Sequence, residues 1–100
     1  MKRIVLFCGN GFTTAMVSKK LEKAIQAHGY NYTSAAFPYS ELKDEGAKAD
    51  IILLAPQIRF NLNRVKQQFP DTPVLLLDMR TYATLEGDEV MKQVVELIGE

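Results

Sequence analysis

The chain has 100 residues, which is the length of one domain with a core of four or five strands. Its 47% hydrophobic and 24% charged residues are ordinary values for a globular protein in water. Twelve Lys and Arg residues balance twelve Asp and Glu residues, so the net charge gives no support for nucleic-acid binding. A single cysteine cannot form an internal disulfide, so we expect a reducing, cytoplasmic environment.

The first predicted strand, Ile4–Phe7, is continuously apolar, as expected of a strand buried on both faces of a parallel sheet. It is too short for a signal peptide or a bilayer span, so we expect no direct insertion into a membrane. A helical pattern of apolar residues follows from Val17 to His28, and Gly29 is predicted to close that helix in a left-handed conformation.

The middle of the chain alternates between strand and helix patterns. Tyr32–Phe37 is a weaker strand, and Glu41–Glu45 is a short helix stopped by Gly46. Asp50–Leu54 is a strongly apolar third strand. Apolar residues at steps of four, three and four then predict one helix over Ile58–Phe69.

The last part of the chain begins with a fourth strand, Val74–Leu77, which has Asp78 at its carboxyl end. We predict Arg80–Glu86 as a loop with room for one helical turn. Within it, Arg80–Leu85 is expected to form an outer wall of a site. Gly87 opens a final amphipathic helix.

This alternation predicts an α/β fold in which residues 1–100 form a single domain. We expect a four-stranded parallel sheet of order 2-1-3-4 with helices on both faces, flavodoxin-like or low-molecular-weight-phosphatase-like. In such sheets a site lies at the carboxyl ends of the strands where the winding reverses. The turn after Cys8 should therefore face Ala55–Phe60.

The connection between the first strand and the first helix carries the most distinctive chemistry. Unpaired N–H groups at a helix start, with the positive end of the helix dipole, bind anions and favour thiolate over thiol. Two glycines suit a tight turn that an oxyanion can approach, and two threonines supply hydroxyl donors. The pattern indicates a nucleophilic sulfur beside a phosphate-sized pocket, formed by Cys8, Gly9, Asn10, Gly11, Phe12, Thr13 and Thr14.

Three other phosphate-binding motifs do not fit this connection. A Walker A loop needs a lysine, and none occurs between Arg3 and Lys19. The dinucleotide fingerprint needs its third small residue where Thr14 stands. A receiver domain needs an aspartate at the end of the third strand, which reads Leu54-Ala55-Pro56.

A cysteine phosphatase or arsenate reductase is the main alternative function. Such a phosphatase has C-x5-R and an aspartic acid, usually before a proline, that protonates the leaving group. Thr14 stands at the arginine position, and no proline follows an aspartate. These absences favour a carrier that accepts a phosphoryl group and holds it. A flavodoxin-like binding module with an inert cysteine is a third possibility.

Four further residues are candidates for the rim of the site or for contacts with a partner. Pro56 and Gln57 follow the third strand, and Gln57 is a candidate to reach the phosphoryl site. Arg59 is predicted to be solvated and able to aid docking. Tyr82 fits equally well as a packing residue or as a rim residue. Phe12 fits equally well as a core residue or as a docking contact for a partner.

The residues from Cys8 to Thr14, C-x-x-G-x-T-T, follow an apolar strand, and A-D-I-I-L-L-A-P-Q-I spans Ala49–Ile58. With the A-F-P turn at Ala36–Pro38, they resemble the IIB component of the bacterial phosphoenolpyruvate-dependent sugar phosphotransferase system (PTS). The lactose/cellobiose/chitobiose branch is the most similar. The resemblance covers nearly the whole chain.

The resemblance implies that Cys8 accepts a phosphoryl group from a phosphohistidine of the IIA component. Cys8 would then pass this group to a sugar held by the membrane transporter IIC, with cellobiose, chitobiose and lactose as candidates. Gly9–Thr14 would form the binding loop, and no metal or cofactor is implied. Asn10 and Ala15 depart from the family's usual smaller and hydroxyl residues, which could change loop polarity or partner preference.

Overall fold

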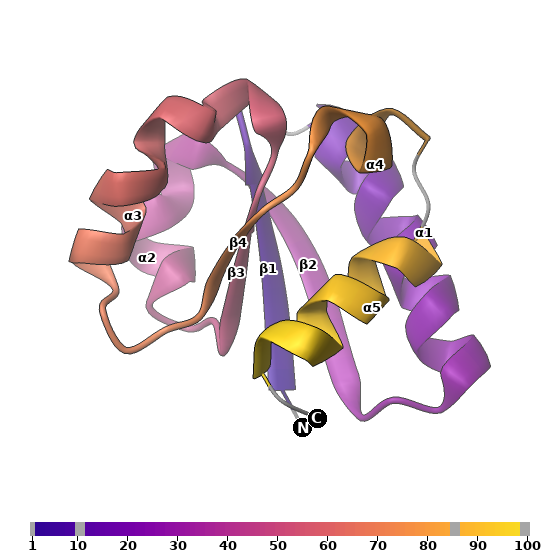
Figure 1. Cartoon of the computed structure of the whole chain (residues 1–100). Coiled ribbons are helices and arrows are strands. Elements are labelled where there is room, and N and C mark those ends of the chain that lie inside the picture. The colour runs from indigo at the N-terminus through magenta and orange to yellow at the C-terminus, as the bar shows by residue number, and fades with distance from the viewer. Residues whose placement is uncertain (1, 10–11, 85–86, 99–100) are drawn as a thin grey trace.

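The computed structural model describes residues 2–9, 12–84 and 87–98, with the side chains of 12–17, 83–84, 87–88 and 98 excepted (Figure 1). Within these ranges strands and helices alternate, and η denotes a 3-10 helix. In chain order the elements are β1 (Lys2–Cys8), α1 (Phe12–His28), β2 (Tyr32–Pro38), η1 (Tyr39–Glu41), α2 (Leu42–Gly46), β3 (Ile51–Leu54), η2 (Pro56–Asn61), α3 (Leu62–Gln68), β4 (Val74–Leu76), α4 (Met79–Thr84) and α5 (Gly87–Ile98).

The four strands form one parallel sheet in the order β2-β1-β3-β4, which confirms the predicted topology. The register pairs Cys8 with Pro38 and Phe7 with Leu54. Leu54 in turn pairs with Leu76. The carboxyl ends of all four strands therefore meet at one edge of the sheet, with the end of β1 between its neighbours.

Helices cover both faces of the sheet, with α1, α4 and α5 on one side and α2 and α3 on the other (Figure 1). Side chains alternate along β1, so Ile4, Leu6 and Cys8 belong to the core cluster that includes residues of α1, α4 and α5. Val5 and Phe7 belong to the second cluster, with residues of α2 and α3. All five side chains are buried, as the apolar run predicts.

Two helices in the middle of the chain differ from the sequence-based prediction. The single helix predicted over Ile58–Phe69 is the second part of η2 followed by α3, and η2 has a kink at Ile58, whose backbone angles are non-helical (φ −111°, ψ 24°). The predicted helix Glu41–Glu45 is α2, shifted by one residue and preceded by η1. The prediction of Gly29 as a left-handed cap is confirmed by its φ of +70°.

The helical turn allowed within the predicted loop after the fourth strand is present as α4, which is longer than expected because it covers Met79–Thr84. The residue before this helix, Asp78, accepts a hydrogen bond on Oδ1 from the Thr81 N–H at 2.6 Å. Its carbonyl accepts the Tyr82 N–H at 3.1 Å. These are the contacts of a helix N-cap, and they start a helix whose apolar periodicity is too short to recognise. Leu85 and Glu86 lie outside the described residues.

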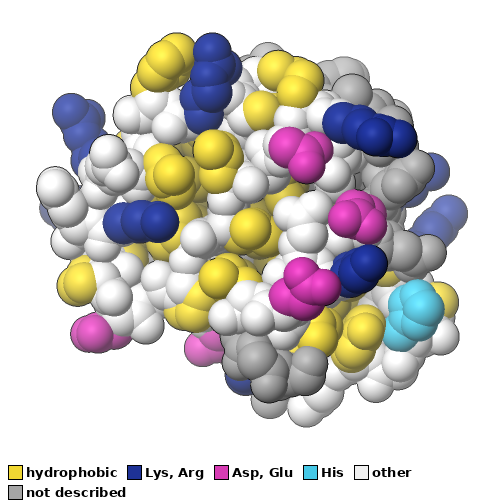
Figure 2. Space-filling view, viewed as in Figure 1, with side chains coloured by type: hydrophobic (Ala, Val, Ile, Leu, Met, Phe, Trp, Pro, Cys, Tyr) yellow, Lys and Arg dark blue, Asp and Glu magenta, His cyan; other side chains and the backbone are white. Residues whose placement is uncertain are grey.

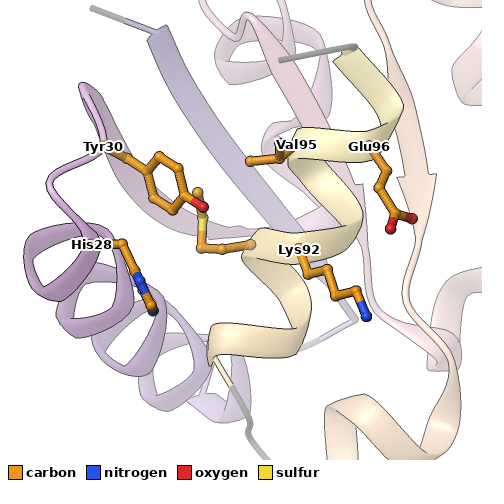
Figure 3. A pocket seen from close by; sticks show the side chains of 6 residues that line it. His28, Tyr30, Lys92, Val95 and Glu96 are labelled. Atoms are coloured by element: carbon orange, nitrogen blue, oxygen red, sulfur yellow. The ribbon is translucent and has the colours of Figure 1, made fainter.

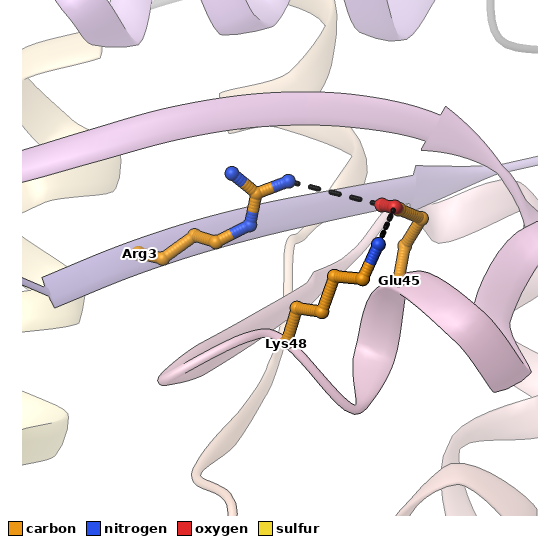
Figure 4. Close-up of polar contacts among 3 residues, drawn as sticks. All are labelled: Arg3, Glu45 and Lys48. Atoms are coloured by element: carbon orange, nitrogen blue, oxygen red, sulfur yellow. Dashed lines mark hydrogen bonds and ion pairs between the residues drawn. The ribbon is translucent and has the colours of Figure 1, made fainter.

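A polar cluster links the start of β1 to α2 (Figure 4). The Arg3 guanidinium lies 3.8 Å from a carboxylate oxygen of Glu45, and the Lys48 ammonium lies 3.4 Å from the other oxygen. The Arg3 N–H also donates to Asp50 Oδ2 at 2.8 Å, just before β3. Arg3 therefore connects three segments at the end of the sheet that is remote from the Cys8 end.

One edge strand of the sheet, β4, is short. Its three residues are each half-buried. The same face of the molecule displays hydrophobic side chains across its middle, with charged side chains around them (Figure 2). A strand of three residues offers little backbone for pairing with another chain.

Candidate functional site

Cys8 is the last residue of the central strand β1, and its side chain points to the face covered by α1, α4 and α5. The side chain is 3% exposed, while the next residue, Gly9, is exposed. The sulfur therefore lies just beneath the edge of the sheet at which ligands bind in open α/β folds, within a hydrophobic core cluster.

Tyr82 of α4 reaches the sulfur from the far end of the chain. Its hydroxyl donates a hydrogen bond to Cys8 Sγ over 3.7 Å, and its side chain is 4% exposed. The sequence left open whether Tyr82 packs in the core or lines the rim. The structure shows a buried residue whose polar end contacts the sulfur.

The position of Tyr82 depends on the start of α4. Asp78 receives the Thr81 N–H, and this hydrogen bond is the main reason that the pKa of the Asp78 carboxyl lies below its ordinary value. The charge of the nearby Arg80 lowers the pKa further. An ionised Asp78 therefore fixes the first turn of the helix that carries Tyr82.

The segment after β3 faces the turn after Cys8, as predicted. The Ala55 N–H donates to the Phe7 carbonyl at 3.0 Å, so the end of β3 is bonded to the end of β1. A methyl group added at Gly9 would lie 3.9 Å from Cγ2 of Ile58. The connections that follow β1 and β3 are therefore within contact distance of each other.

The three remaining rim candidates have different surroundings. Pro56 is buried at the start of η2, so its surface contributes little to the rim. Gln57 and Arg59 are both exposed. The Arg59 guanidinium donates to the Pro56 carbonyl at 3.2 Å and lies over the Phe60 ring, 4.4 Å from its centroid.

The predicted binding loop is only partly described. Asn10 and Gly11 lie outside the described residues. The backbone of Phe12, Thr13 and Thr14 forms the first turn of α1, so these three residues begin the helix rather than extend the turn. The helix amino end thus follows Cys8 after three intervening residues, at the same edge of the sheet.

Two exposed apolar residues at this edge were not singled out from the sequence. Phe60 is 81% exposed in η2, and Met79 is 57% exposed at the start of α4. Phe60 follows β3, the neighbour of β1, and Met79 follows the edge strand β4, which pairs with β3. An exposed aromatic next to strand-end turns was the available signal, although single exposed apolar residues are common.

Two surface grooves lie away from the sulfur. One, of about 410 Å³, runs between the end of α1 and α5, where His28, Tyr30, Lys92, Val95 and Glu96 border it (Figure 3). The other, of about 570 Å³, is bordered mainly by residues of α2, including Glu45 and Lys48. Neither groove is lined by Cys8 or Tyr82.

The fold and this edge define an open α/β domain with a cysteine at the carboxyl end of its central strand. The family model described as "PTS system, Lactose/Cellobiose specific IIB subunit" matches residues 3–93. The chain belongs to this family. It is accordingly a phosphotransferase component of a sugar-transport system, and IIA and IIC proteins are the other parts of that system.

Individual proteins with the same architecture are known from several bacteria. The oligo-beta-mannoside-specific EIIB component of Bacillus subtilis is 28% identical over 98% of this chain and 97% of its own length. The cellobiose-specific IIB protein of Borrelia burgdorferi has a TM-score of 0.77 and 30% identity, covering 96% of this chain and 90% of that one. The lactose-specific IIB domain of Streptococcus pneumoniae has a TM-score of 0.85 at 17% identity, with 95% of both chains covered.

No helix in the described ranges is long and apolar enough to cross a membrane.

Proposed function

We propose that Cys8 is the residue of this IIB component that carries the phosphoryl group. It accepts the group from a phosphohistidine of IIA and passes it to a sugar held by IIC. The observation that supports this most is the position of the chain's one cysteine, at the carboxyl end of the central strand and just before the start of α1. Helix starts favour both a thiolate and a bound phosphoryl group.

The first step forms an S–P bond as the Cys8 thiolate attacks the phosphorus. The P–N bond to the IIA histidine breaks, and its electron pair stays on the ring nitrogen. In the second step a sugar hydroxyl oxygen forms a bond to the same phosphorus and loses its proton to solvent. The S–P bond then breaks and the thiolate is restored, so Cys8 is a nucleophile in one step and a leaving group in the other.

Access to the sulfur requires local movement, because Cys8 is 3% exposed. Among the described side chains of α4, Tyr82 contacts the sulfur. Movement of the connections around the sulfur when a partner docks would admit the phosphorus and then exclude water again. Exclusion of water protects a covalent intermediate from hydrolysis.

Partners would dock on the edge of the sheet that carries Cys8. Phe60 and Met79 expose apolar surface there, and Arg59 is positioned by its contacts with Pro56 and Phe60. Aromatic residues and arginine are enriched among residues that dominate binding energy. IIA and IIC would bind this edge in turn. We place this exchange in the cytoplasm, a reducing compartment in which the thiol of the chain's one cysteine stays reduced.

The sugar is proposed only as a class. The names of similar proteins refer to oligo-beta-mannosides, galactose, cellobiose and lactose, which differ from one another. A β-linked disaccharide is the proposal that fits the cellobiose and lactose names, and its selection is assigned to IIC.

The experiment that tests this function is reconstitution of sugar phosphorylation from phosphoenolpyruvate with the general PTS proteins, IIA, IIC and this chain. We expect Cys8→Ser to abolish transfer to cellobiose or lactose while the fold, followed by circular dichroism, is retained. Full activity of Cys8→Ser would favour a binding module with an inert cysteine. Steady-state hydrolysis of an aryl phosphate by the isolated wild-type protein would instead favour a cysteine phosphatase.

A further inference from the structure

We propose that Tyr82 is a positioning residue for the Cys8 sulfur, through a hydroxyl group that favours and orients the thiolate. This inference rests on the proposed role of Cys8 as the phosphoryl carrier. It gives a role to Tyr82, which lies 74 positions from Cys8 in the sequence.

The Tyr82 hydroxyl is buried beside the Cys8 sulfur. The side chain of Tyr82 is 4% exposed and belongs to the same core cluster as Cys8, whose other buried members are aliphatic apart from Tyr32 and Met91. Its hydroxyl reaches Cys8 Sγ at 3.7 Å with the tyrosine as donor. A purely packing role would be served equally well by phenylalanine, so the hydroxyl needs a separate explanation.

A charged sulfur is energetically costly in this hydrophobic cluster. A thiolate surrounded by aliphatic side chains is unfavourable unless donors compensate the lost hydration. A phenol is a good donor, and a hydrogen bond to an ionised acceptor is stronger than one to a neutral acceptor. The Tyr82 hydroxyl therefore favours S⁻ over S–H.

The same bond acts in both steps of the proposed reaction. Before IIA docks, it raises the population of nucleophile and holds the sulfur on the α4 side. When the phosphoryl group is transferred to the sugar, the hydrogen bond stabilises the Cys8 thiolate that is released as the S–P bond breaks. Stabilising a thiolate lowers its intrinsic nucleophilicity only partially, so the larger thiolate population prevails near neutral pH.

The helix that carries Tyr82 is suited to hold the hydroxyl in place. Asp78 accepts the Thr81 N–H through its carboxylate and the Tyr82 N–H through its carbonyl. The backbone of Tyr82 is thus bonded at one end while its hydroxyl contacts sulfur at the other.

The test measures the pH profile of Cys8 alkylation by iodoacetamide in the full chain, with no phosphoryl donor present. We expect Tyr82→Phe to move the profile to higher pH by about one unit. The more basic thiolate is also a stronger nucleophile, so the rate at high pH, where every sulfur is ionised, should rise by about threefold and the rate at neutral pH should fall by about threefold. Tyr32→Phe is the matched control, because Tyr32 is also buried in this cluster but pairs with Lys2 at the opposite end of β1.

An unchanged profile for Tyr82→Phe would overturn the proposal. Faster alkylation at every pH would also overturn it, since the hydroxyl would then only shield the sulfur. Replacement of Tyr82 by a fluorotyrosine keeps the ring and strengthens the donor, so the profile should move to lower pH even if Tyr82→Phe does not fold. Because the assay contains no phosphoryl donor, its failure is distinct from a failure of Cys8 to carry phosphorus.

Discussion

The hydroxyl of Tyr82 lies 3.7 Å from the sulfur of Cys8, so a residue near the end of the chain contacts the end of its first strand. The contact arises because the chain leaves the edge strand β4, returns across the carboxyl edge of the sheet and forms α4 on the face that Cys8 occupies (Figure 1). Changes in α4 should therefore alter the surroundings of the Cys8 sulfur.

Asp78→Asn should reduce stability in a manner that depends on pH. The Thr81 N–H lowers the pKa of Asp78, so its stabilising effect is complete above the ordinary pKa of about 4 and is lost as the pH falls through the lowered value. Thermal unfolding of wild type and Asp78→Asn should show a constant gap in Tm at neutral pH that closes in strong acid. Asp71→Asn, in an exposed turn, is the control. A gap that is independent of pH would contradict this account.

Gly46→Ala should destabilise the protein by about 1–3 kcal/mol, because the added methyl group overpacks the core. The methyl carbon would lie 2.7 Å from Cζ of the Phe69 ring, because Gly46 in α2 and Phe69 at the end of α3 lie side by side. Urea unfolding would measure the loss, and Phe69→Leu in the Gly46→Ala background should recover part of it. Equal stability of Gly46→Ala and wild type would show that the ring moves aside at no cost.

The ion pair between Arg3 and Glu45 should contribute little. Their side chains are 36% and 15% exposed and their charged atoms are 3.8 Å apart, so a double-mutant cycle should give a coupling of about 0.2–1 kcal/mol that decreases with added salt. The cycle would use Arg3→Met and Glu45→Gln, with Lys48→Met and Glu45→Gln as the more exposed comparison. A coupling of several kcal/mol would mean that Arg3 is a major structural residue at the start of β1.

Phe60→Ser should separate partner contact from stability. Phe60 is 81% exposed, so its replacement should change the free energy of unfolding by less than about 0.5 kcal/mol. If the edge around Cys8 receives IIA, phosphorylation at low IIA concentration should slow by about tenfold, the effect of one moderate binding residue. Leu97→Ser, at an exposed position in α5, should leave the rate unchanged. Equal rates for wild type and Phe60→Ser would place the docking surface elsewhere.

The sheet was predictable from the sequence because its strands are buried on both faces. Continuous apolar runs mark β1 and β3, and parallel connections with right-handed crossovers leave few orders in which four such strands can lie. The turn after Cys8 and the segment after β3 were expected to face each other for the same reason. Short-range backbone features were less predictable, since the break at Ile58 and the formation of α4 depend on single hydrogen bonds and dihedral angles.

The sequence predicted only those parts of the site that depend on residues adjacent in the chain. Cys8 could be placed at a strand end because the strand itself was evident. Tyr82 could not be assigned to the sulfur, because the contact depends on how α4 returns over the sheet and on the rotation of one side chain. The exposure of Phe60 likewise depends on the kinked path of η2 rather than on a periodic pattern.

The most direct test of the central claim is to locate the phosphoryl group after the chain is incubated with phosphorylated IIA, using mass spectrometry of peptides prepared under conditions that preserve thiophosphate. The account predicts one phosphoryl group on Cys8 and none on the Cys8→Ser variant. A phosphoryl group on His28, or wild-type protein that stays unlabelled beside an active IIA, would contradict it.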